Sequence, residues 1–240
     1  MKDINRNIWL ITLPHAGGST ALYKGFGKKI NCNILNIEYP GHWTRMNEPI
    51  INSYYELKNE VMSIVLNNIQ TGEEVIIFGH SLGAILGWDI VPALLNNKIE
   101  VKALFLSGSQ NPGSFPEKAI LCAETDEKKL ELIGFDSKKF SKEMNKQFMK
   151  TFFPILKTDL AVCKSFSCDN HYVDVDTLVL YGSNDRFTNV DEIIKWKKYT
   201  RIVFMKEFCG GHLFIEDKNN MDTIIEMLNR KIQEIAMNRK

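Results

Sequence analysis

The first 107 residues alternate short apolar runs with segments whose apolar positions recur at helical spacing. The runs are bounded by turn residues, so we predict strands at residues 7–13, 33–38, 74–78 and 101–107. Helices are predicted behind Ser53-x-x-Glu56, which has the form of a capping box, and over residues 82–95. The apolar face of the first helix holds Leu57, Val61, Ile64 and Val65. Strands that are apolar on both faces and separated by helices predict a mostly parallel sheet with helices on both sides.

The alternation stops at about residue 108 and resumes after residue 172. The intervening stretch is rich in Lys and Glu and has no convincing strand. It contains an aromatic stripe at helical spacing, formed by Phe140, Met144, Phe148 and Phe152. Beyond it we predict strands at 177–181 and 201–205, a helix from about residue 190 between them, and a last helix. The apolar face of that last helix holds Met221, Ile224, Ile225, Leu228, Ile232 and Ile235.

Length and composition limit the class of protein. At roughly 150 residues per domain, 240 residues favour a single α/β domain, 1–240, with a lid-like insertion at about 108–172. The net charge is only +1, which argues against a nucleic-acid binder or a basic membrane-surface protein. No apolar stretch approaches the roughly 18 residues of a membrane span. The apolar run at residues 8–13 is short for a signal peptide and is better explained as a first buried strand.

The five cysteines are odd in number and scattered, and none forms a C-x-x-C pair. This pattern indicates reduced thiols and a cytoplasmic protein. Cys209-x-x-His212 could be half of a metal site, but the sequence offers no second half, so we expect no metal.

Gly79-His80-Ser81-Leu82-Gly83 fits the G-x-S-x-G pattern of a nucleophile elbow. An elbow places its serine on a sharp turn from a strand to a helix, and the flanking positions must avoid a clashing Cβ. The predicted strand at 74–78 and helix at 82–95 supply that context. We therefore predict that Ser81 is a catalytic nucleophile, with a glycine-rich turn as the alternative.

On this type of sheet the chain order is nucleophile, acid, histidine. Two histidines follow Ser81. His212 lies just past the strand at 201–205, whereas His171 would need an acid from within the insertion. Asp185 follows the strand at 177–181, so Ser81, Asp185 and His212 are the predicted triad. The reserve acids are Asp191 and Asp176.

An acyl-transfer site also needs two N–H donors where negative charge develops. One is predicted to be the backbone of Leu82, immediately after the nucleophile. The other is expected from the loop at residues 14–18, where two glycines permit close approach of the backbone. Of the histidines that precede Ser81, we expect His15 to order this loop and His80 to pack within the elbow.

At this point the chain resembles a known family, the type II (editing) thioesterases of nonribosomal peptide and polyketide synthesis. The resemblance extends across nearly the whole chain and is carried by the elbow, by Asp185, by Gly-Gly-His at 210–212 and by three other motifs. These motifs are Leu13-Pro14-His15-Ala16-Gly17-Gly18-Ser19, Tyr39-Pro40-Gly41 with Arg45 and Glu48-Pro49, and Phe153-Pro154-Ile155-Leu156-Lys157-Thr158-Asp159. The chain departs from the family pattern at His42-Trp43 (expected Arg-Gly), Lys157-Thr158 (expected Arg-Ala) and Arg186 (expected Pro).

The resemblance implies an α/β-hydrolase fold with a helical lid. It also implies a stand-alone hydrolase that removes acyl groups from the phosphopantetheine arm of acyl- or peptidyl-carrier protein domains. In that interpretation the N–H groups of Ala16 and Leu82 hold the oxyanion, and no metal or organic cofactor is needed. The stripe Phe140/Met144/Phe148/Phe152 is then either a wall for the acyl chain or a packing surface against the domain body, and a lid can be both.

Three other functions are compatible with the same residues. A carboxylesterase or lipase would share the triad, and an acyltransferase differs only in which nucleophile reaches the acyl-enzyme. A catalytically silent scaffold would keep the fold alone. Hydrolysis of a thioester against its oxyester, and labelling of Ser81 by a fluorophosphonate, would separate these classes.

Overall fold

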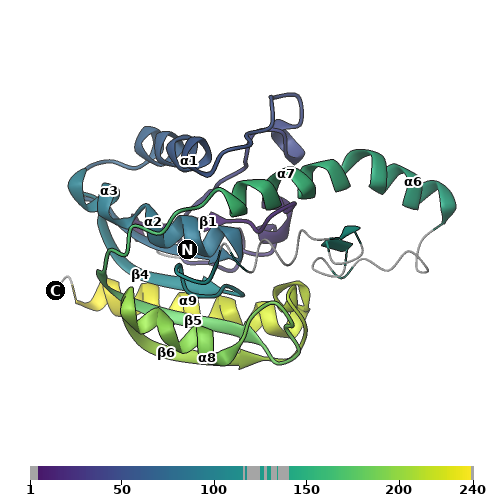
Figure 1. The fold of residues 1–240 in the computed structure, drawn as a ribbon. Helices are drawn as coiled ribbons and strands as arrows, with labels where there is room; N and C mark the ends of the chain where they lie inside the picture. Colours follow the sequence, from purple (N-terminus) through teal and green to yellow (C-terminus); the bar gives the residue numbers. More distant parts are fainter. Residues whose placement is uncertain are drawn as a thin grey trace.

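The structure is a computed structural model that describes residues 5–115, 117, 125–126, 129–130, 134 and 141–238. Six strands form one sheet in the order β2-β1-β3-β4-β5-β6, and all neighbouring pairs are parallel. The strands are β1 (Asn5–Leu13), β2 (Cys32–Asn36), β3 (Glu74–His80), β4 (Glu100–Ser107), β5 (Val173–Gly182) and β6 (Thr200–Phe208). The predicted parallel sheet is therefore confirmed, and Figure 1 shows how the helices surround it.

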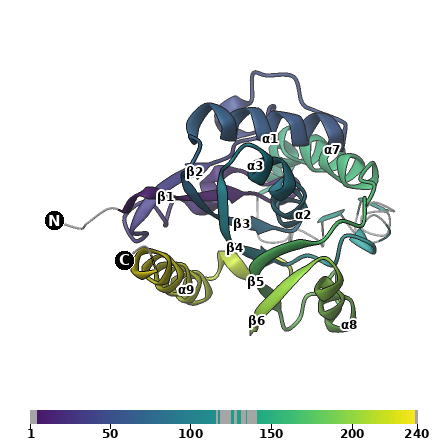
Figure 2. The ribbon, with the colours of Figure 1, turned by 90° about the vertical axis from the view of Figure 1, so that its left-hand side faces the viewer.

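The two faces of the sheet bury two different apolar clusters. In β3, Val75 and Ile77 belong to one cluster, whereas Ile76 and Phe78 belong to the other, as the two-residue period of a strand requires. The first cluster packs against α1 (Tyr54–Asn68), α2 (Leu82–Asp89), α3 (Val91–Asn96), α7 (Phe153–Lys164), α8 (Val190–Ile193) and η4 (Ile194–Lys198). The second packs against η1 (Thr20–Tyr23), η5 (Phe214–Glu216) and α9 (Lys218–Met237). Figure 2 shows α9 on one side of the sheet and α1, α2 and α3 on the other.

The winding of the sheet reverses at β1, which lies between β2 and β3. Loops at the carboxyl ends of the strands diverge at such a switch point, and ligands of open α/β sheets bind there. Leu13 at the end of β1 pairs with Gly79 of β3. The loop at residues 14–18 therefore starts beside the turn that carries Ser81.

The helix predicted over residues 82–95 is two helices. α2 ends at Asp89, and α3 begins at Val91 with Pro92 in its first turn. Proline has no N–H to donate to the preceding turn, so it ends one helix and is tolerated at the start of the next. The strand predicted at 33–38 is also shorter, because β2 ends at Asn36 although Ile37 and Glu38 remain buried.

The predicted capping box at Ser53 is wrong, although the helix does begin at Tyr54. Ser53 is the N-cap residue, but its side chain makes no capping hydrogen bond. The Tyr54 N–H instead donates to Ser165 Oγ, at 3.0 Å, just beyond α7. A distant segment thus satisfies one of the free N–H groups in the first turn of α1.

Within the insertion, two helices occupy residues 142–164, as predicted. α6 (Lys142–Thr151) and α7 follow one another with Phe152 at their junction. In Figure 1, α7 lies over the sheet, and α6 extends beyond it to the right. Phe140, the first residue of the predicted stripe, lies outside the described residues.

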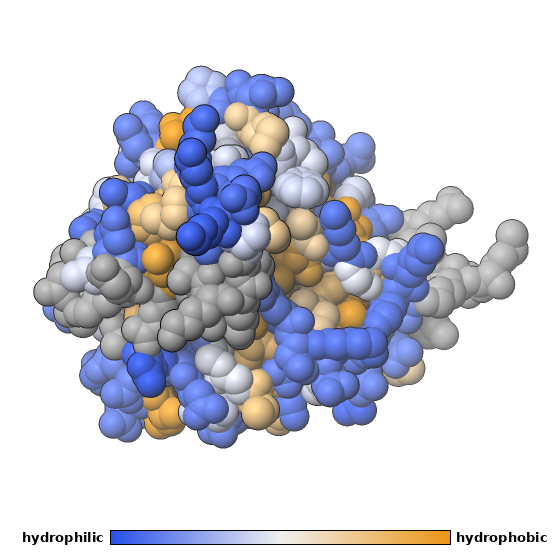
Figure 3. Space-filling model, turned by 90° about the vertical axis from the view of Figure 1, so that its right-hand side faces the viewer, coloured by the Kyte–Doolittle hydropathy of each residue, from blue (hydrophilic) through white to orange (hydrophobic). Residues whose placement is uncertain are grey.

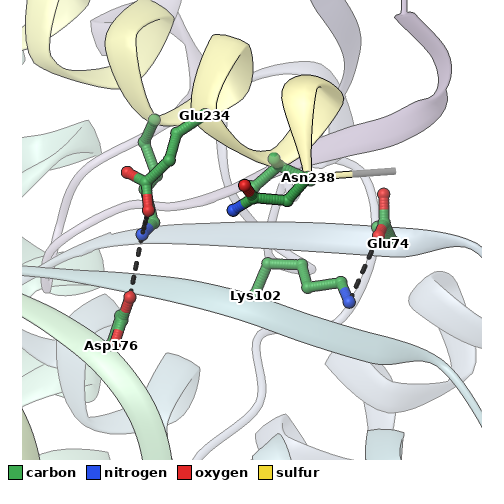
Figure 4. A pocket seen from close by; sticks show the side chains of 7 residues that line it. Glu74, Lys102, Asp176, Glu234 and Asn238 are labelled. Atoms are coloured by element: carbon green, nitrogen blue, oxygen red, sulfur yellow. Dashed lines mark hydrogen bonds and ion pairs between the residues drawn. The ribbon is translucent and has the colours of Figure 1, made fainter. Parts of the chain in front are cut away.

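At the opposite end of the strands, one ion pair joins α9 to β5 and another joins β4 to β3. Lys231 Nζ donates to Asp176 Oδ2 at 2.8 Å, and Lys102 Nζ lies 3.2 Å from Glu74 Oε1 (Figure 4). This cluster lies at the amino ends of β3, β4 and β5, away from the elbow. In the part of the chain that the structure describes, no helix combines the length and apolar character that crossing a membrane requires.

Candidate active site

Ser81 occupies a strained turn between β3 and α2. Its backbone has φ 55° and ψ −113°, a conformation that L-residues rarely adopt outside functional turns. The flanking glycines explain how the turn fits, because a Cβ at Gly79 would lie 2.1 Å from the Gly83 carbonyl oxygen and one at Gly83 would lie 2.1 Å from the Leu13 carbonyl oxygen. The Ser81 N–H donates to the Ser107 carbonyl at 2.8 Å, which ties the turn to the end of β4.

Asp185 and His212 come together at the ends of β5 and β6. His212 Nδ1 lies 2.9 Å from Asp185 Oδ2, and both residues are buried. The Phe187 N–H donates to Asp185 Oδ1 at 2.8 Å and holds the carboxylate in place. Burial raises the pKa of Asp185, but His212 and these hydrogen bonds outweigh it and leave the pKa below its usual range. The carboxylate is thus ionised and accepts a hydrogen bond from His212 Nδ1.

The pairing with Asp185 uses Nδ1, so the other ring nitrogen of His212, Nε2, is not bonded to the carboxylate. His212 Nε2 is buried and has no hydrogen-bond partner among the described residues. An imidazole held at Nδ1 by a carboxylate carries its lone pair on Nε2, which is the nitrogen that acts as a general base in a serine triad. The ring edge is also packed by Phe187, whose centroid lies 5.8 Å away.

His80, the elbow residue before Ser81, packs against His212. Its ring centroid is 5.2 Å from that of His212 and 5.6 Å from that of Phe214, and its Nδ1 lies 2.9 Å from Ser107 Oγ. Burial lowers the pKa of His80 well below its ordinary value, so the ring is neutral. These contacts give His80 the packing position that the sequence predicts, and they bring the Ser81 turn next to the Asp185–His212 pair.

The alternative triad residues lie elsewhere. His171 stacks on Trp88 with ring centroids 3.9 Å apart. Asp176 is paired with Lys231 near the amino end of β5, and Asp191 is exposed in the first turn of α8. Of the three acids considered, Asp185 is the one that contacts His212.

The loop at residues 14–18 is held by its own histidine. His15 Nδ1 donates to the Ala16 carbonyl at 2.9 Å, and the Gly18 N–H donates to the His15 carbonyl at 2.9 Å. Burial lowers the pKa of His15 to about 4, so its ring is neutral at pH 7. Among the described residues, neither the Ala16 N–H nor the Leu82 N–H has an acceptor, which leaves both available to an oxyanion.

The predicted lid stripe is partly exposed. Met144 is 55% and Phe152 is 42% exposed, whereas Phe148 is half-buried and packs against the core beside α7. Phe148 and Phe152 stack with ring centroids 6.0 Å apart. Figure 3 faces this end of the molecule and shows apolar atoms gathered in a recess between hydrophilic ones. That these side chains meet an acyl chain stays a prediction.

One contact that the sequence did not predict joins the lid to the loop at residues 14–18. Asp159 of α7 accepts the Gly17 N–H at Oδ2, at 2.6 Å, and the same oxygen lies 2.9 Å from His42 Nε2. A signal existed in the sequence, because Asp159 shares the buried face of α7 with Leu156, Leu160 and Cys163. A carboxylate on an apolar helix face requires a buried partner.

Comparisons with known proteins identify the family of this chain. The family model for the thioesterase domain matches residues 9–232, so the chain belongs to the thioesterase domain family and is a thioester hydrolase. It is 26% identical over 224 residues to the probable anguibactin biosynthesis thioesterase AngT of Vibrio anguillarum, covering 88% of this chain and 87% of AngT. It is 28% identical over 238 residues to the medium-chain S-acyl fatty acid synthase thioesterase of Rattus norvegicus, covering 95% and 88%.

A solved structure shows the same architecture. ClbQ, from the colibactin NRPS/PKS pathway, superposes with a TM-score of 0.81 at 24% identity, over 96% of this chain and 99% of ClbQ. The α/β-hydrolase fold that the sequence implies is therefore confirmed.

Proposed function

We propose that this protein is a stand-alone, type II thioesterase that hydrolyses acyl groups from the phosphopantetheine thiol of carrier protein domains in a nonribosomal peptide or polyketide synthase. The observation that carries the chemistry is the Asp185–His212 pair, 2.9 Å apart, beside the strained Ser81 turn. The choice of pathway is supported by the similarity to AngT and ClbQ, which are named for anguibactin biosynthesis and the colibactin NRPS/PKS pathway, and by the motifs at residues 13–19 and 153–159. The free cysteines support a cytoplasmic site of action.

The first half of the reaction acylates Ser81. Its Oγ attacks the thioester carbonyl carbon while His212 Nε2 takes the hydroxyl proton, and the ionised Asp185 stabilises the imidazolium. The N–H groups of Ala16 and Leu82 hold the tetrahedral oxyanion. When the C–S bond breaks, His212 returns the proton to the sulfur. A thiol with a pKa near 8.5 leaves with less protonation than an amine needs.

The second half hydrolyses the acyl-enzyme. His212 removes a proton from water, the hydroxide adds to the ester carbonyl, and the same two N–H groups hold the second oxyanion. Collapse breaks the C–O bond to Ser81, which recovers its proton from His212 as the free acid leaves. Every proton in this cycle passes through His212, so the proposal includes no metal and no organic cofactor.

A substrate comparison tests the proposal. We would measure kcat/KM for an acyl group on a carrier protein, for the same acyl group on a small thiol, and for the matching oxyester. The proposal predicts that kcat/KM is highest for the carrier thioester, lower for the small thioester and lowest for the oxyester. Faster hydrolysis of the oxyester would indicate a carboxylesterase, and transfer to an added alcohol or amine in preference to water would indicate an acyltransferase.

A further inference from the structure

The contact between α7 and the loop at residues 14–18 involves a pair of buried polar side chains. Asp159 and His42 are only 2% and 3% exposed. Asp159 Oδ2 receives the Gly17 N–H at 2.6 Å and meets His42 Nε2 at 2.9 Å. A single carboxylate oxygen thus joins three segments: the loop after β1, the loop after β2 and the second lid helix.

Both ring nitrogens of His42 face oxygen atoms. Nδ1 lies 3.0 Å from the Pro40 carbonyl oxygen and Nε2 lies 2.9 Å from Asp159. A carbonyl oxygen can only accept, and a neutral imidazole carries one N–H. Asp159 Oδ2 already accepts the Gly17 N–H, so both contacts of His42 are hydrogen bonds to acceptors only when the ring is an imidazolium. The geometry therefore describes a buried ion pair.

The charges around His42 favour that form. Asp159 faces it from α7 and Glu38 lies on its own segment, while His15 in the loop after β1 is neutral. Burial lowers the pKa of His42, but the Asp159 hydrogen bond and charge, together with Pro40 and Glu38, raise it above its ordinary value. The Tyr39 ring packs edge-on against His42 at 5.6 Å and its hydroxyl donates to the Pro14 carbonyl at 2.9 Å, which fixes the same segment a second time.

The peptide unit between Ala16 and Gly17 is held at both ends. Its carbonyl accepts from His15 Nδ1 at 2.9 Å, and its N–H donates to Asp159 at 2.6 Å. Because a peptide unit is planar, fixing its two polar atoms fixes the orientation of the Ala16–Gly17 plane. The Ala16 N–H belongs to the preceding peptide unit, whose His15 carbonyl accepts the Gly18 N–H at 2.9 Å. The two planes meet at the Ala16 Cα, so tying both of them restricts the rotation that aims the Ala16 N–H. Leu156 adds a steric limit, since a Cβ at Gly17 would lie 3.1 Å from its side chain.

We propose that Asp159 and His42 are positioning residues for the oxyanion hole: their buried pair holds the Ala16–Gly17 peptide unit against α7, so that the lid helix sets the direction of the Ala16 N–H. This inference rests on the proposed function in one respect, the assignment of Ala16 as an oxyanion donor. The pair stabilises the loop while His42 is protonated. At a pH above the raised pKa of His42 the ring loses one proton and with it one of its two hydrogen bonds, so the restraint weakens as pH rises.

The test uses Asp159→Asn, His42→Gln and His42→Arg, with Asp89→Asn as the matched control. Asp89 is also a buried carboxylate on a helix, bonded to Tyr54 at 3.1 Å and Lys58 at 2.9 Å, and it does not contact the loop. Loss of an oxyanion donor costs about 10²–10³-fold in kcat, so a misaimed donor should cost about tenfold or more with KM changed less than twofold. Asp159→Asn and His42→Gln should show this loss, and Asp89→Asn should not. His42→Arg, which stays charged, should retain more activity than His42→Gln and lack the decline of kcat at alkaline pH.

A second readout separates this inference from the proposed function. The rate at which a fluorophosphonate labels Ser81 also depends on the oxyanion hole, and it needs no thioester. Slower labelling in Asp159→Asn and His42→Gln, with thermal melting that shows both variants folded, supports the positioning role even if the wild type fails on carrier thioesters. Unchanged labelling and unchanged kcat in both folded variants would overturn it. If a variant does not fold, the labelling rate of Ser81 is instead measured against pH in the wild type and in His42→Arg. The proposal predicts that the rate declines at alkaline pH in the wild type alone, and identical pH profiles contradict it.

Discussion

Asp185 and His212 are 27 positions apart in the chain, yet Asp185 Oδ2 lies 2.9 Å from His212 Nδ1. Parallel register explains the meeting, because Gly182 at the end of β5 pairs with Phe208 at the end of β6. The loops that follow are pressed together: a Cβ at Gly182 would lie 2.5 Å from the Gly211 carbonyl oxygen. Two adjacent strands thus place an acid and a base at the carboxyl end of the sheet, where the Ser81 turn also lies.

Asp185→Asn should reduce kcat on the order of 10³-fold or more and change KM modestly. The amide can hold the wrong imidazole tautomer and cannot stabilise its positive charge. Steady-state kinetics on an acyl thioester measure the effect, with the exposed Asp191→Asn as the matched control. A neutral Asp185→Asn together with a crippled Asp191→Asn would reassign the acid.

The buried histidines predict a loss of stability in mild acid. Burial lowers the pKa of His15 from 6.5 to about 4, so between these values the unfolded chain binds a proton that the folded protein does not. The free energy of unfolding should therefore fall as pH drops from 6.5 to 4, by up to about 1.4 kcal/mol per pH unit for this site. Burial lowers the pKa of His80 as well, which adds in the same direction.

Chemical denaturation at several pH values measures that slope. His15→Gln removes one titrating site. The dependence of the free energy of unfolding on pH should therefore become shallower, by up to about 1.4 kcal/mol per pH unit, the contribution of one proton. An unchanged slope in His15→Gln would show that the His15 ring is protonated alike in the folded and unfolded states.

Gly83→Ala should distort the elbow. The added Cβ would meet the Leu13 carbonyl oxygen at 2.1 Å, and neither backbone can move without disturbing β1 or α2. Overpacking of this kind costs about 1–3 kcal/mol, so a lower melting temperature and a lower Ser81 labelling rate are expected. Gly27→Ala is the control, since a Cβ there meets nothing within 4 Å. Equal effects at the two positions would contradict the account of the turn.

Three exposed lysines on α6, Lys142, Lys146 and Lys150, provide a test of carrier docking. Lys138 and Lys139, which precede them in the sequence, lie outside the described residues. If this face meets an acidic carrier protein, changing the three to Glu should lower kcat/KM for the acyl-carrier substrate, and added salt should do the same to the wild type. Turnover of a small acyl thioester should barely change. Equal loss on both substrates would mean that the lysines support the lid itself.

Several features were predictable because they depend on local pattern. Continuous apolar runs such as that of β3 indicate buried parallel strands, and a G-x-S-x-G match between a strand and a helix indicates the Ser81 turn. The chain order then selects Asp185 and His212, which the structure places in contact. The break between α2 and α3 also has a local cause, Pro92, which the helical pattern around it concealed.

Other features depend on partners that no local pattern contains. Ser53 makes no capping bond, and the acceptor for the Tyr54 N–H is Ser165, which follows α7 far along the chain. The meeting of His42 with Asp159 needs two loops and a helix to be arranged in space. The sequence could identify Asp159 as a polar residue on an apolar helix face, but it could not identify the partner.

The most direct test of the central claim is the hydrolysis of an acyl-carrier thioester by the wild type and by Ser81→Ala, with acyl-enzyme followed by intact-protein mass spectrometry. Removal of a triad nucleophile leaves only the oxyanion hole and binding, so kcat should fall on the order of 10³-fold or more. The wild type alone should gain the mass of the acyl group, and the melting temperatures of the two proteins should agree. Activity of Ser81→Ala within tenfold of the wild type, or an acyl adduct on the variant, would contradict the account.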